Sequence, residues 1–252
     1  MAPGGKFRIM TYNVHGCIGR DGQASPYRIA EVIASFSPDI AALQELDVNR
    51  IRTGVVDQPR VIAGDLNMYF HFNPSFGLEE EQYGNAMLSR YPVKLIKAGA
   101  LPSLPNRSGL ETRSVLWVSV EINGMEVQIM NTHLGLNRTE RLAQMEAITG
   151  PEWIKAPGFR PPFILCGDLN CGPGSRVYKT LTALLRDVQC PLHGRPRKTW
   201  PSMLPLTRLD HIFASGDLNV LDCQVPHGKL LRYASDHLPL IAELGITSKG
   251  WA

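Results

Sequence analysis

Short apolar runs that end in polar residues recur along this chain. Four of these runs are typical of strands buried on both faces, although short buried helices give a similar pattern. They are Phe7 to Met10, Ile40 to Leu43, Val127 to Met130 and Phe163 to Cys166. Further strands are predicted at about 69–72, 85–89, 93–98, 115–120, 209–214 and 238–243. The pair Asn123-Gly124 lies between two apolar runs and predicts a hairpin over residues 114–130.

Helices are predicted between several of these strands. Ser25 before Pro26 fits an N-cap followed by proline at the first helical position, and Ser175 is a second candidate cap. The predicted helices cover about 26–35, 58–66, 138–149 and 175–186. Strands and helices alternate, but hairpins also occur. We therefore expect mixed sheets covered by helices.

Length and composition fit one large globular domain. The chain has 252 residues with 44% hydrophobic content, which suits a single α/β domain over residues 1–252. No apolar stretch approaches the roughly 18–20 residues that span a bilayer. The segment 1–6 lacks the apolar core of a secretory signal, and the five cysteines show no CxxC spacing. We expect a cytoplasmic monomer in a reducing compartment.

The net charge does not identify a substrate. A formal charge of +3 is too small to mark a nucleic-acid binder. Basic residues gather locally at 193–198 and around Lys229 and Arg232. Such clusters either hold phosphates or form solvated loops, and the sequence leaves both open.

Polar side chains with acid–base or metal-binding chemistry follow the apolar runs. Carboxylates, amides and imidazoles at several strand ends indicate one site assembled from distant segments, and suit a cation with oxygen ligands beside proton-transfer groups. Because few of them are histidines, Mg²⁺ or Mn²⁺ fits better than zinc. These residues are Asn13, Glu45, His133, Asp168, Asn170, Asp210, Asp236 and His237. We interpret the chain as a metal-dependent phosphoester hydrolase.

The string GDLN occurs three times, at 64–67, 167–170 and 216–219. Only the second copy follows a predicted buried strand and precedes a glycine-proline loop, so we predict function for Asp168 and Asn170. We interpret the other two copies as ordinary turn chemistry, with Asp217 and Asn219 in a turn and the first copy between a helix and a strand.

His237 and His133 are the two histidines with candidate roles in proton transfer or phosphate binding. Asp210 is a candidate to orient His237, because a carboxylate can fix an imidazole's tautomer and stabilise its charged form. His133 is a second candidate proton donor or phosphate contact. Arg113 serves either as a phosphate contact or as half of a surface ion pair. For His15 we favour a structural role, and the same holds for His211.

In order and spacing these motifs resemble the endonuclease/exonuclease/phosphatase superfamily. That group includes deoxyribonuclease I, AP endonucleases, neutral sphingomyelinases, inositol polyphosphate 5-phosphatases and deadenylases. The resemblance extends from Tyr12-Asn13 to Ser235-Asp236-His237. It implies an α/β fold, a four-layer α/β sandwich with two central mixed β-sheets flanked by helices, as in deoxyribonuclease I. The site would lie at the shared edge of the two sheets.

The resemblance also implies metal-site and water-site roles. Asn13, Glu45 and Asp236 would be metal-site residues, with Glu45 the principal ligand. Asp168 would orient or deprotonate the attacking water, and Asn170 would bind phosphate and position that water. The implied cofactor is Mg²⁺ or Mn²⁺.

For the histidines, the resemblance pairs Asp210 with His237 and gives His237 the stabilisation of the pentacovalent phosphate. His133 matches the deoxyribonuclease and sphingomyelinase branches, whereas many AP endonucleases carry a tyrosine there, which weakens an AP-endonuclease assignment. The strings 83–92 and 199–202 resemble a compact bacterial branch, similar to a hydrolase domain associated with GPI-anchor lipid remodelling. We predict Asn85 and Arg113 as substrate-binding residues.

The leading function is a phosphodiesterase that cleaves P–O bonds by in-line attack of activated water. One alternative is a nuclease acting on DNA or RNA, which needs a basic groove. Another is a hydrolase of phospholipid headgroups resembling sphingomyelinase, for which residues 200–206 could supply an apolar rim. A non-catalytic binding protein on the same scaffold is disfavoured because the metal acids, the water-orienting acid and the final histidine are all present.

Overall fold

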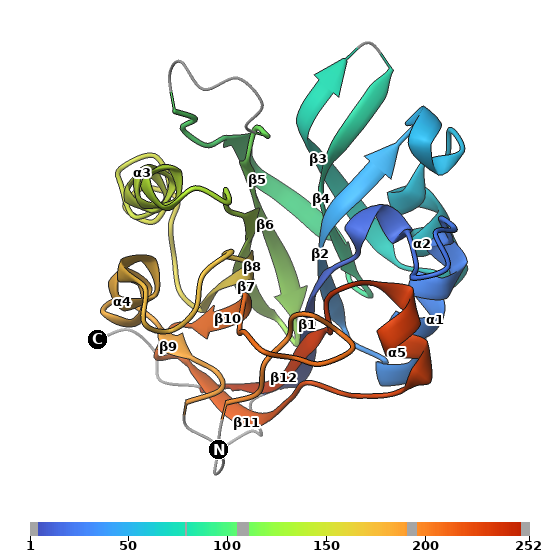
Figure 1. Ribbon diagram of the computed structural model, residues 1–252. Helices are drawn as coiled ribbons and strands as arrows, with labels where there is room; N and C mark the ends of the chain where they lie inside the picture. The colour runs from blue at the N-terminus through green and yellow to red at the C-terminus, as the bar shows by residue number, and fades with distance from the viewer. Residues whose placement is uncertain (1–4, 79, 105–110, 191–195, 248–252) are drawn as a thin grey trace.

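Two six-stranded β-sheets form the centre of the molecule in this computed structural model (Figure 1), which describes residues 5–78, 80–104, 111–190 and 196–247. The strand order is β11-β12-β1-β2-β4-β3 in the first sheet and β5-β6-β7-β8-β10-β9 in the second. The strands are β1 (Lys6–Asn13), β2 (Ile40–Val48), β3 (Tyr69–Leu78), β4 (Glu81–Ser89), β5 (Val93–Ala100), β6 (Ser114–Ile122), β7 (Met125–His133), β8 (Phe163–Asp168), β9 (Arg186–Asp187), β10 (Asp210–Ala214), β11 (Leu218–Gln224) and β12 (Leu240–Ile246).

Both sheets are mixed, and they share one pattern of strand direction. Each contains a central parallel pair, β1 with β2 and β7 with β8, and its other neighbouring strands run antiparallel. The carboxyl ends of a parallel pair meet at one edge, where the antiparallel neighbours β10 and β12 begin. The fold therefore brings the residues that end β1, β2, β7 and β8 close to those that precede or open β10 and β12.

Helices cover the outer faces of the two sheets. In Figure 1, α1, α2 and α5 lie on one side of the molecule, and α3 and α4 lie on the other. One apolar core fills the space between the sheets and beneath α1 and α2, and a second lies between β6–β8 and α3 with α4. The four-layer α/β sandwich expected from the sequence is confirmed. The helices are α1 (Pro26–Phe36), α2 (Gln58–Leu66), α3 (Arg138–Ile148), α4 (Arg176–Thr182) and α5 (Lys229–Ala234), with short 3-10 turns η1 (His15–Cys17) and η2 (Ile51–Thr53).

Local sequence signals account for most element boundaries. The Ser25 hydroxyl accepts a hydrogen bond from the Arg28 backbone N–H, and α1 then starts at Pro26 as predicted. In the β6–β7 hairpin, Asn123 and Gly124 both have positive φ angles, of 52° and 78°, as a tight primed turn requires. Within the described ranges, every helix is too short or too polar to cross a bilayer.

Several predicted boundaries were wrong. The helix predicted at 175–186 ends at Thr182, residues 183–185 form a turn, and Arg186 lies in β9. The third GDLN copy does not form one turn, because Asn219 lies in β11. In the first copy Asp65 belongs to α2. Strand β11 pairs only with β12 and is largely exposed, so its sequence lacks the apolar run that marks a buried strand. Part of the basic cluster at 193–198, residues 193–195, lies outside the described residues.

Candidate active site

A cavity of about 490 Å³ opens at the edge where the two parallel strand pairs end. Seven of the ten predicted site residues line it, and Asn13 and Asp210 are buried against them. The topology explains this convergence, because β1, β2, β7 and β8 all finish at this edge. The cavity is lined by His15, Glu45, Tyr83, Glu111, Arg113, His133, Gly135, Leu136, Glu140, Asp168, Asn170, Trp200, Leu209, Asp236 and His237.

A β-bulge turns the Glu45 carboxylate into the cavity. The pairing of β2 with β4 shifts register between Leu43 and Leu46, and Glu45 has a positive φ of 61°. Its Oε1 accepts a hydrogen bond of 2.8 Å from Asn13 Nδ2, which also donates to Asp168 Oδ2 at 3.0 Å. Asn13 thus holds two carboxylates from different sheets in place, while its own oxygen accepts from the His15 backbone N–H.

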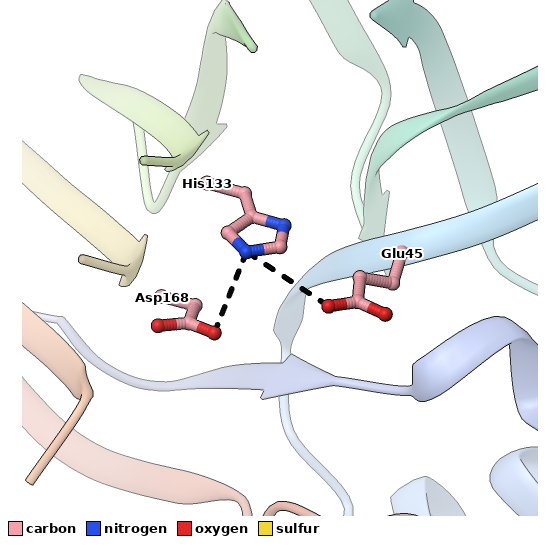
Figure 2. Close-up of side chains that lie close together, drawn as sticks. All are labelled: Glu45, His133 and Asp168. Carbon is pink, nitrogen blue, oxygen red and sulfur yellow. Dashed lines mark ion pairs between the residues drawn. The ribbon is translucent and has the colours of Figure 1, made fainter. Parts of the chain in front are cut away.

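Glu45, His133 and Asp168 converge on one point (Figure 2). His133 Nε2 lies 3.8 Å from Glu45 Oε1 and 3.6 Å from Asp168 Oδ2. Burial alone would raise the pKa of Glu45, but hydrogen bonds from His15 and Asn13 outweigh it and lower that pKa well below its usual range. Glu45 is therefore ionised at neutral pH and available to a cation.

His15 lies between the carboxylates of Asp236 and Glu45. The His15 Nδ1 atom lies 3.6 Å from Glu45 Oε2 and 3.7 Å from Asp236 Oδ1. The hydrogen bond to Glu45 raises the pKa of His15, with partial burial opposing it and the Asp236 charge adding to it. A histidine between two carboxylates occupies a place where a cation can bind. The sequence had favoured a structural role for His15, whereas the structure places it inside the cavity.

The donor set fits a hard divalent cation. Glu45 and Asp168 offer carboxylate oxygens within one cluster, and Asp236 offers another across His15. Mg²⁺ and Mn²⁺ prefer oxygen ligands of this kind, whereas zinc sites usually contain cysteine or several histidines. Asn13 contributes here as the donor that orients the acids, since its amide nitrogen faces them.

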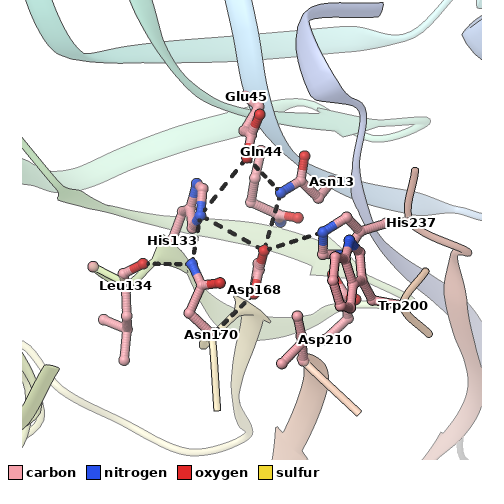
Figure 3. A network of polar contacts seen from close by, with 12 residues as sticks. Asn13, Gln44, Glu45, His133, Leu134, Asp168, Asn170, Trp200, Asp210 and His237 are labelled. Atoms are coloured by element: carbon pink, nitrogen blue, oxygen red, sulfur yellow. Dashed lines mark hydrogen bonds and ion pairs between the residues drawn. The ribbon is translucent and has the colours of Figure 1, made fainter. Parts of the chain in front are cut away.

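His237 forms a buried pair with Asp210. The Nδ1 atom of His237 lies 2.8 Å from Asp210 Oδ2, and its Nε2 lies 3.6 Å from Asp168 Oδ2. Burial alone would lower the pKa of His237, but the charges of Asp210 and Asp168 outweigh it and raise the pKa to about 10. The imidazolium consequently carries an Nε2–H donor at neutral pH, and that side of the ring faces Asp168 (Figure 3) at the cavity.

Asp168 occupies the centre of the network and is almost fully buried. Its Oδ1 accepts from the Asn170 backbone N–H at 2.8 Å, which fixes the carboxylate plane. Burial raises the pKa of Asp168 to about 6; His237 opposes this shift and Asp210 adds to it. A carboxylate with that pKa is mostly ionised at neutral pH, yet basic enough to accept a proton.

Arg113 determines which nitrogen of His133 carries the proton. Its guanidinium nitrogen lies 2.9 Å from His133 Nδ1 and can only donate, so Nδ1 must accept. Burial lowers the pKa of His133 to about 3, and the Arg113 charge adds to the effect, so the ring is neutral with its proton on Nε2. Arg113 is itself buried, although its second nitrogen pairs with Glu111 at 3.0 Å. Arg113 thus makes both an ion pair with the exposed Glu111 and a buried contact with His133.

Asn170 adds a second donor beside His133. Its Nδ2 lies 3.0 Å from His133 Nε2 and donates to the Leu134 carbonyl at 2.8 Å. With the proton on Nε2 this contact places two donors side by side, so neither satisfies the other. One N–H of Asn170 is thus taken by the Leu134 carbonyl, and the other lies beside the Nε2–H of His133 at the cavity.

A buried amide bridge joins the two sheets beneath the cavity. Gln44 Nε2 donates to Asn131 Oδ1 at 2.8 Å, and Asn131 donates to the backbone carbonyls of Leu43 and Ala86. Both residues are fully buried. This network fixes the position of β2 relative to β7 in the facing sheet, and with it the separation of Glu45 from His133.

Not every predicted site residue lies at the cavity. Asn85 is buried and donates to the Ser114 carbonyl at 3.4 Å, and it is absent from the described residues that line the cavity. The structure thus gives no support to Asn85 as a substrate ligand. His211 is also buried and contacts the Cys171 carbonyl at 2.9 Å, as a structural histidine would. Sequence reasoning missed Tyr83 and Glu111 as cavity residues.

Comparison with known proteins gives consistent matches along the chain. A sequence model of the Endonuclease/Exonuclease/phosphatase family matches residues 10–237. The uncharacterized protein YbhP of Escherichia coli (strain K12) is 27% identical over 251 residues, covering 94% of this chain and 96% of that protein.

Solved structures show the same fold. An endonuclease/exonuclease/phosphatase from Beutenbergia cavernae is 23% identical with a TM-score of 0.76, covering 98% of this chain and 73% of its own. The mannosyl-6-phosphatase Bt3783 of Bacteroides thetaiotaomicron is 19% identical with a TM-score of 0.74, covering 94% of this chain and 99% of its own.

Proposed function

The chain belongs to the endonuclease/exonuclease/phosphatase family, whose members hydrolyse phosphoester bonds, and we propose that it is an Mg²⁺- or Mn²⁺-dependent phosphodiesterase. One observation carries this proposal. Two carboxylates, Glu45 and Asp168, face N–H donors from His133, Asn170 and His237 across a single cavity. A phosphodiester needs both halves of that arrangement, because its oxygens are negative and its phosphorus is attacked by water.

Asp168 is the proposed general base. Its pKa of about 6 makes it both ionised and basic near neutral pH, which suits proton abstraction from an attacking water. The Asn170 backbone N–H and the Asn13 amide hold its two oxygens, so the carboxylate is oriented before the water arrives. Such positioning lowers the barrier because little reorganisation remains to be done.

The three N–H donors are the proposed stabilisers of the developing phosphorane charge. His237 is cationic, whereas His133 is neutral with its proton on Nε2, and Asn170 supplies an amide proton beside it. Donors that are already oriented in a buried site stabilise a transition state more than they would in water. Bound at the Glu45 side, Mg²⁺ would neutralise phosphate oxygens and stabilise the leaving oxygen.

A nuclease remains the second candidate. A pair of basic residues favours it: Arg197 and Arg232 both lie close enough to His227 to add to the lowering of its pKa by burial. The solved mannosyl-6-phosphatase shares this fold, so a phosphate monoester also belongs among the substrates to be tested. A binding protein without catalysis is disfavoured, because the acids and the His237 pair are complete.

Hydrolysis of a chromogenic phosphodiester is expected to require Mg²⁺ or Mn²⁺. Treatment with EDTA should abolish turnover, and either ion should restore it. Replacing Glu45 with glutamine is expected to weaken the metal affinity, measured by titration calorimetry, about 10- to 100-fold, because it removes a charged oxygen ligand. Glu31→Gln, an exposed glutamate on α1, is the matched control.

The same assay should include single- and double-stranded DNA, abasic DNA, RNA, sphingomyelin, phosphoinositides and a phosphate monoester. Full turnover by the metal-stripped wild type, with no response to added ion, would contradict the proposed chemistry. So would a Glu45→Gln variant that binds metal and turns over like wild type.

Replacing Arg113 with methionine is expected to lower kcat about 10- to 100-fold with a small change in KM. Without the donor at Nδ1, the proton of His133 can move from Nε2 to Nδ1, and the cavity loses one N–H donor. Nitrogen NMR of the His133 ring should report that change directly. Arg113→Lys keeps a cationic donor, so it should retain more of the kcat and more of the Nε2-protonated form of His133 than Arg113→Met. An unchanged tautomer in Arg113→Met would refute this role.

A further inference from the structure

Exposed apolar side chains lie at the cavity and along the loop that continues from it. This apolar rim comprises Leu136, Trp200, Met203, Leu204 and Leu206. Leu136 and Trp200 line the cavity, and the other three belong to the loop that Trp200 opens. Leu136 is 74% exposed, Leu204 is 68% and Leu206 is 57%. Several large apolar side chains exposed to water beside one cavity indicate a surface that meets an apolar partner.

The loop that carries the rim is tied to the catalytic network. The Thr207 N–H donates to the Trp200 carbonyl at 2.9 Å, and the Ser202 N–H donates to the Asp236 carbonyl at 2.7 Å. The Trp200 indole N–H donates to Asp236 Oδ2 at 3.2 Å, and Figure 3 shows Trp200 on the His237 side of the network. These backbone hydrogen bonds hold the loop, with Leu204 and Leu206 exposed on it, next to the cavity residue Trp200.

Basic side chains flank this loop on the protein surface. Lys198 and Arg197 are exposed directly before it, and Lys229 and Arg232 are exposed on α5. Helix α5 contacts the loop, since the Arg232 carbonyl accepts a hydrogen bond of 3.3 Å from Ser202. Apolar side chains beside lysine and arginine are the combination that binds an anionic lipid–water interface.

We propose that the apolar rim docks on an anionic lipid surface, so that the cavity receives the phosphoester headgroup of a lipid. The inference rests on the proposed function, because the cavity must first bind a phosphoester. It also requires aliphatic side chains to enter the boundary between lipid headgroups and acyl chains. Burial there is favourable for leucine and methionine, and tryptophan prefers the interface. A nucleic acid gains less from this rim, since bases stack on aromatic and guanidinium planes rather than on leucines.

The test compares vesicle binding with turnover of a soluble diester. Wild type is expected to co-sediment with vesicles of phosphatidylcholine and phosphatidylserine, and less with phosphatidylcholine alone. The double variant Leu204→Asp/Leu206→Asp should bind the mixed vesicles at least about tenfold more weakly, because charged side chains cannot enter the acyl boundary. Leu221→Asp, at a leucine that is 51% exposed on β11, is the matched control and should bind like wild type.

Turnover of the soluble diester separates the two hypotheses. Equal turnover by wild type and the double variant, with vesicle binding lost only in the variant, supports the inference. Diester turnover without vesicle binding by wild type would overturn the inference and leave the proposed function standing. No diester turnover by wild type would instead count against the proposed function.

Two further comparisons distinguish lipid docking from a folding defect and from binding of a nucleic acid. If the aspartates lower diester turnover, Leu204→Ser/Leu206→Ser repeats the comparison with a milder change. Equal loss of vesicle binding in Leu221→Asp would overturn the inference. So would a rim variant that cleaves RNA or DNA more slowly while binding vesicles normally.

Discussion

Replacing Asp168 with asparagine is expected to lower kcat for phosphoester hydrolysis about a thousandfold or more, because the substitution removes the proposed general base. The side chain keeps its shape, and its oxygen can still accept from the Asn170 N–H. A neutral amide, however, cannot take a proton from water. It also no longer attracts the His237 imidazolium that lies 3.6 Å away.

The fold should survive this substitution. Asparagine loses the hydrogen bond from Asn13, but it also removes a buried charge whose pKa is raised to about 6 by burial. An acid with a raised folded-state pKa makes the protein less stable as pH rises from 3.8 through 6, so removing it offsets the lost bond at neutral pH. The thermal midpoint is expected to stay close to that of wild type.

Asp65→Asn is the matched control for this experiment, since Asp65 occupies the same position in another copy of GDLN. It is exposed on α2 and should change neither kcat nor the thermal midpoint. Near-normal turnover by a folded Asp168→Asn protein would eliminate Asp168 as the base. Loss of fold in that variant would instead show that the carboxylate is needed for structure.

The sheets could be predicted because their strands are continuous apolar runs. Residues 40–43 and 163–166 are fully buried, and each run leads directly into an acid that faces the cavity, Glu45 or Asp168. A strand buried on both faces is a continuous apolar run, and such a run can be recognised in the sequence without knowing which strands pair with it. Strand β11 and helix α5 lack it, since both are partly exposed and α5 has only six residues, and neither was predicted.

The contacts inside the site depended on geometry that a single sequence does not encode. His15 faces Glu45 and Asp236 because its backbone has a positive φ of 50°, within a turn that also contains Gly16. Arg113 could be singled out as charged, but its contact with His133 depends on the pairing of β6 with β7. Such contacts join residues that are distant in sequence, and no local pattern marks them.

The two histidines of the site show how the environment divides one residue type into two functions. They enter the cavity from different sheets, His133 at the end of β7 and His237 just before β12. A guanidinium faces Nδ1 of His133, whereas a carboxylate faces Nδ1 of His237. One ring is consequently neutral and the other cationic at neutral pH, so a phosphate in the cavity meets one charged donor and one neutral donor.

Replacing Asp210 with asparagine is expected to lower kcat about 100-fold or more at neutral pH and to move the alkaline limb of its pH profile toward neutrality. In wild type, Asp210 helps to keep the pKa of His237 at about 10, so the imidazolium persists through neutral pH. Without that carboxylate, burial lowers the pKa and His237 loses its proton earlier. The kcat profile of wild type should therefore decline only near pH 10, and that of the variant well below it.

Stability supplies an independent measurement of the same pair. Because the folded-state pKa of His237 exceeds its ordinary value of 6.5, the stabilisation is complete below pH 6.5 and is lost as pH rises through about 10. Urea unfolding of wild type across that range should show a falling free energy of unfolding, and Asp210→Asn should flatten the slope. Asp217→Asn, at the turn before β11, serves as the control. Identical slopes and identical alkaline limbs in wild type and Asp210→Asn would show that Asp210 does not hold the charge on His237.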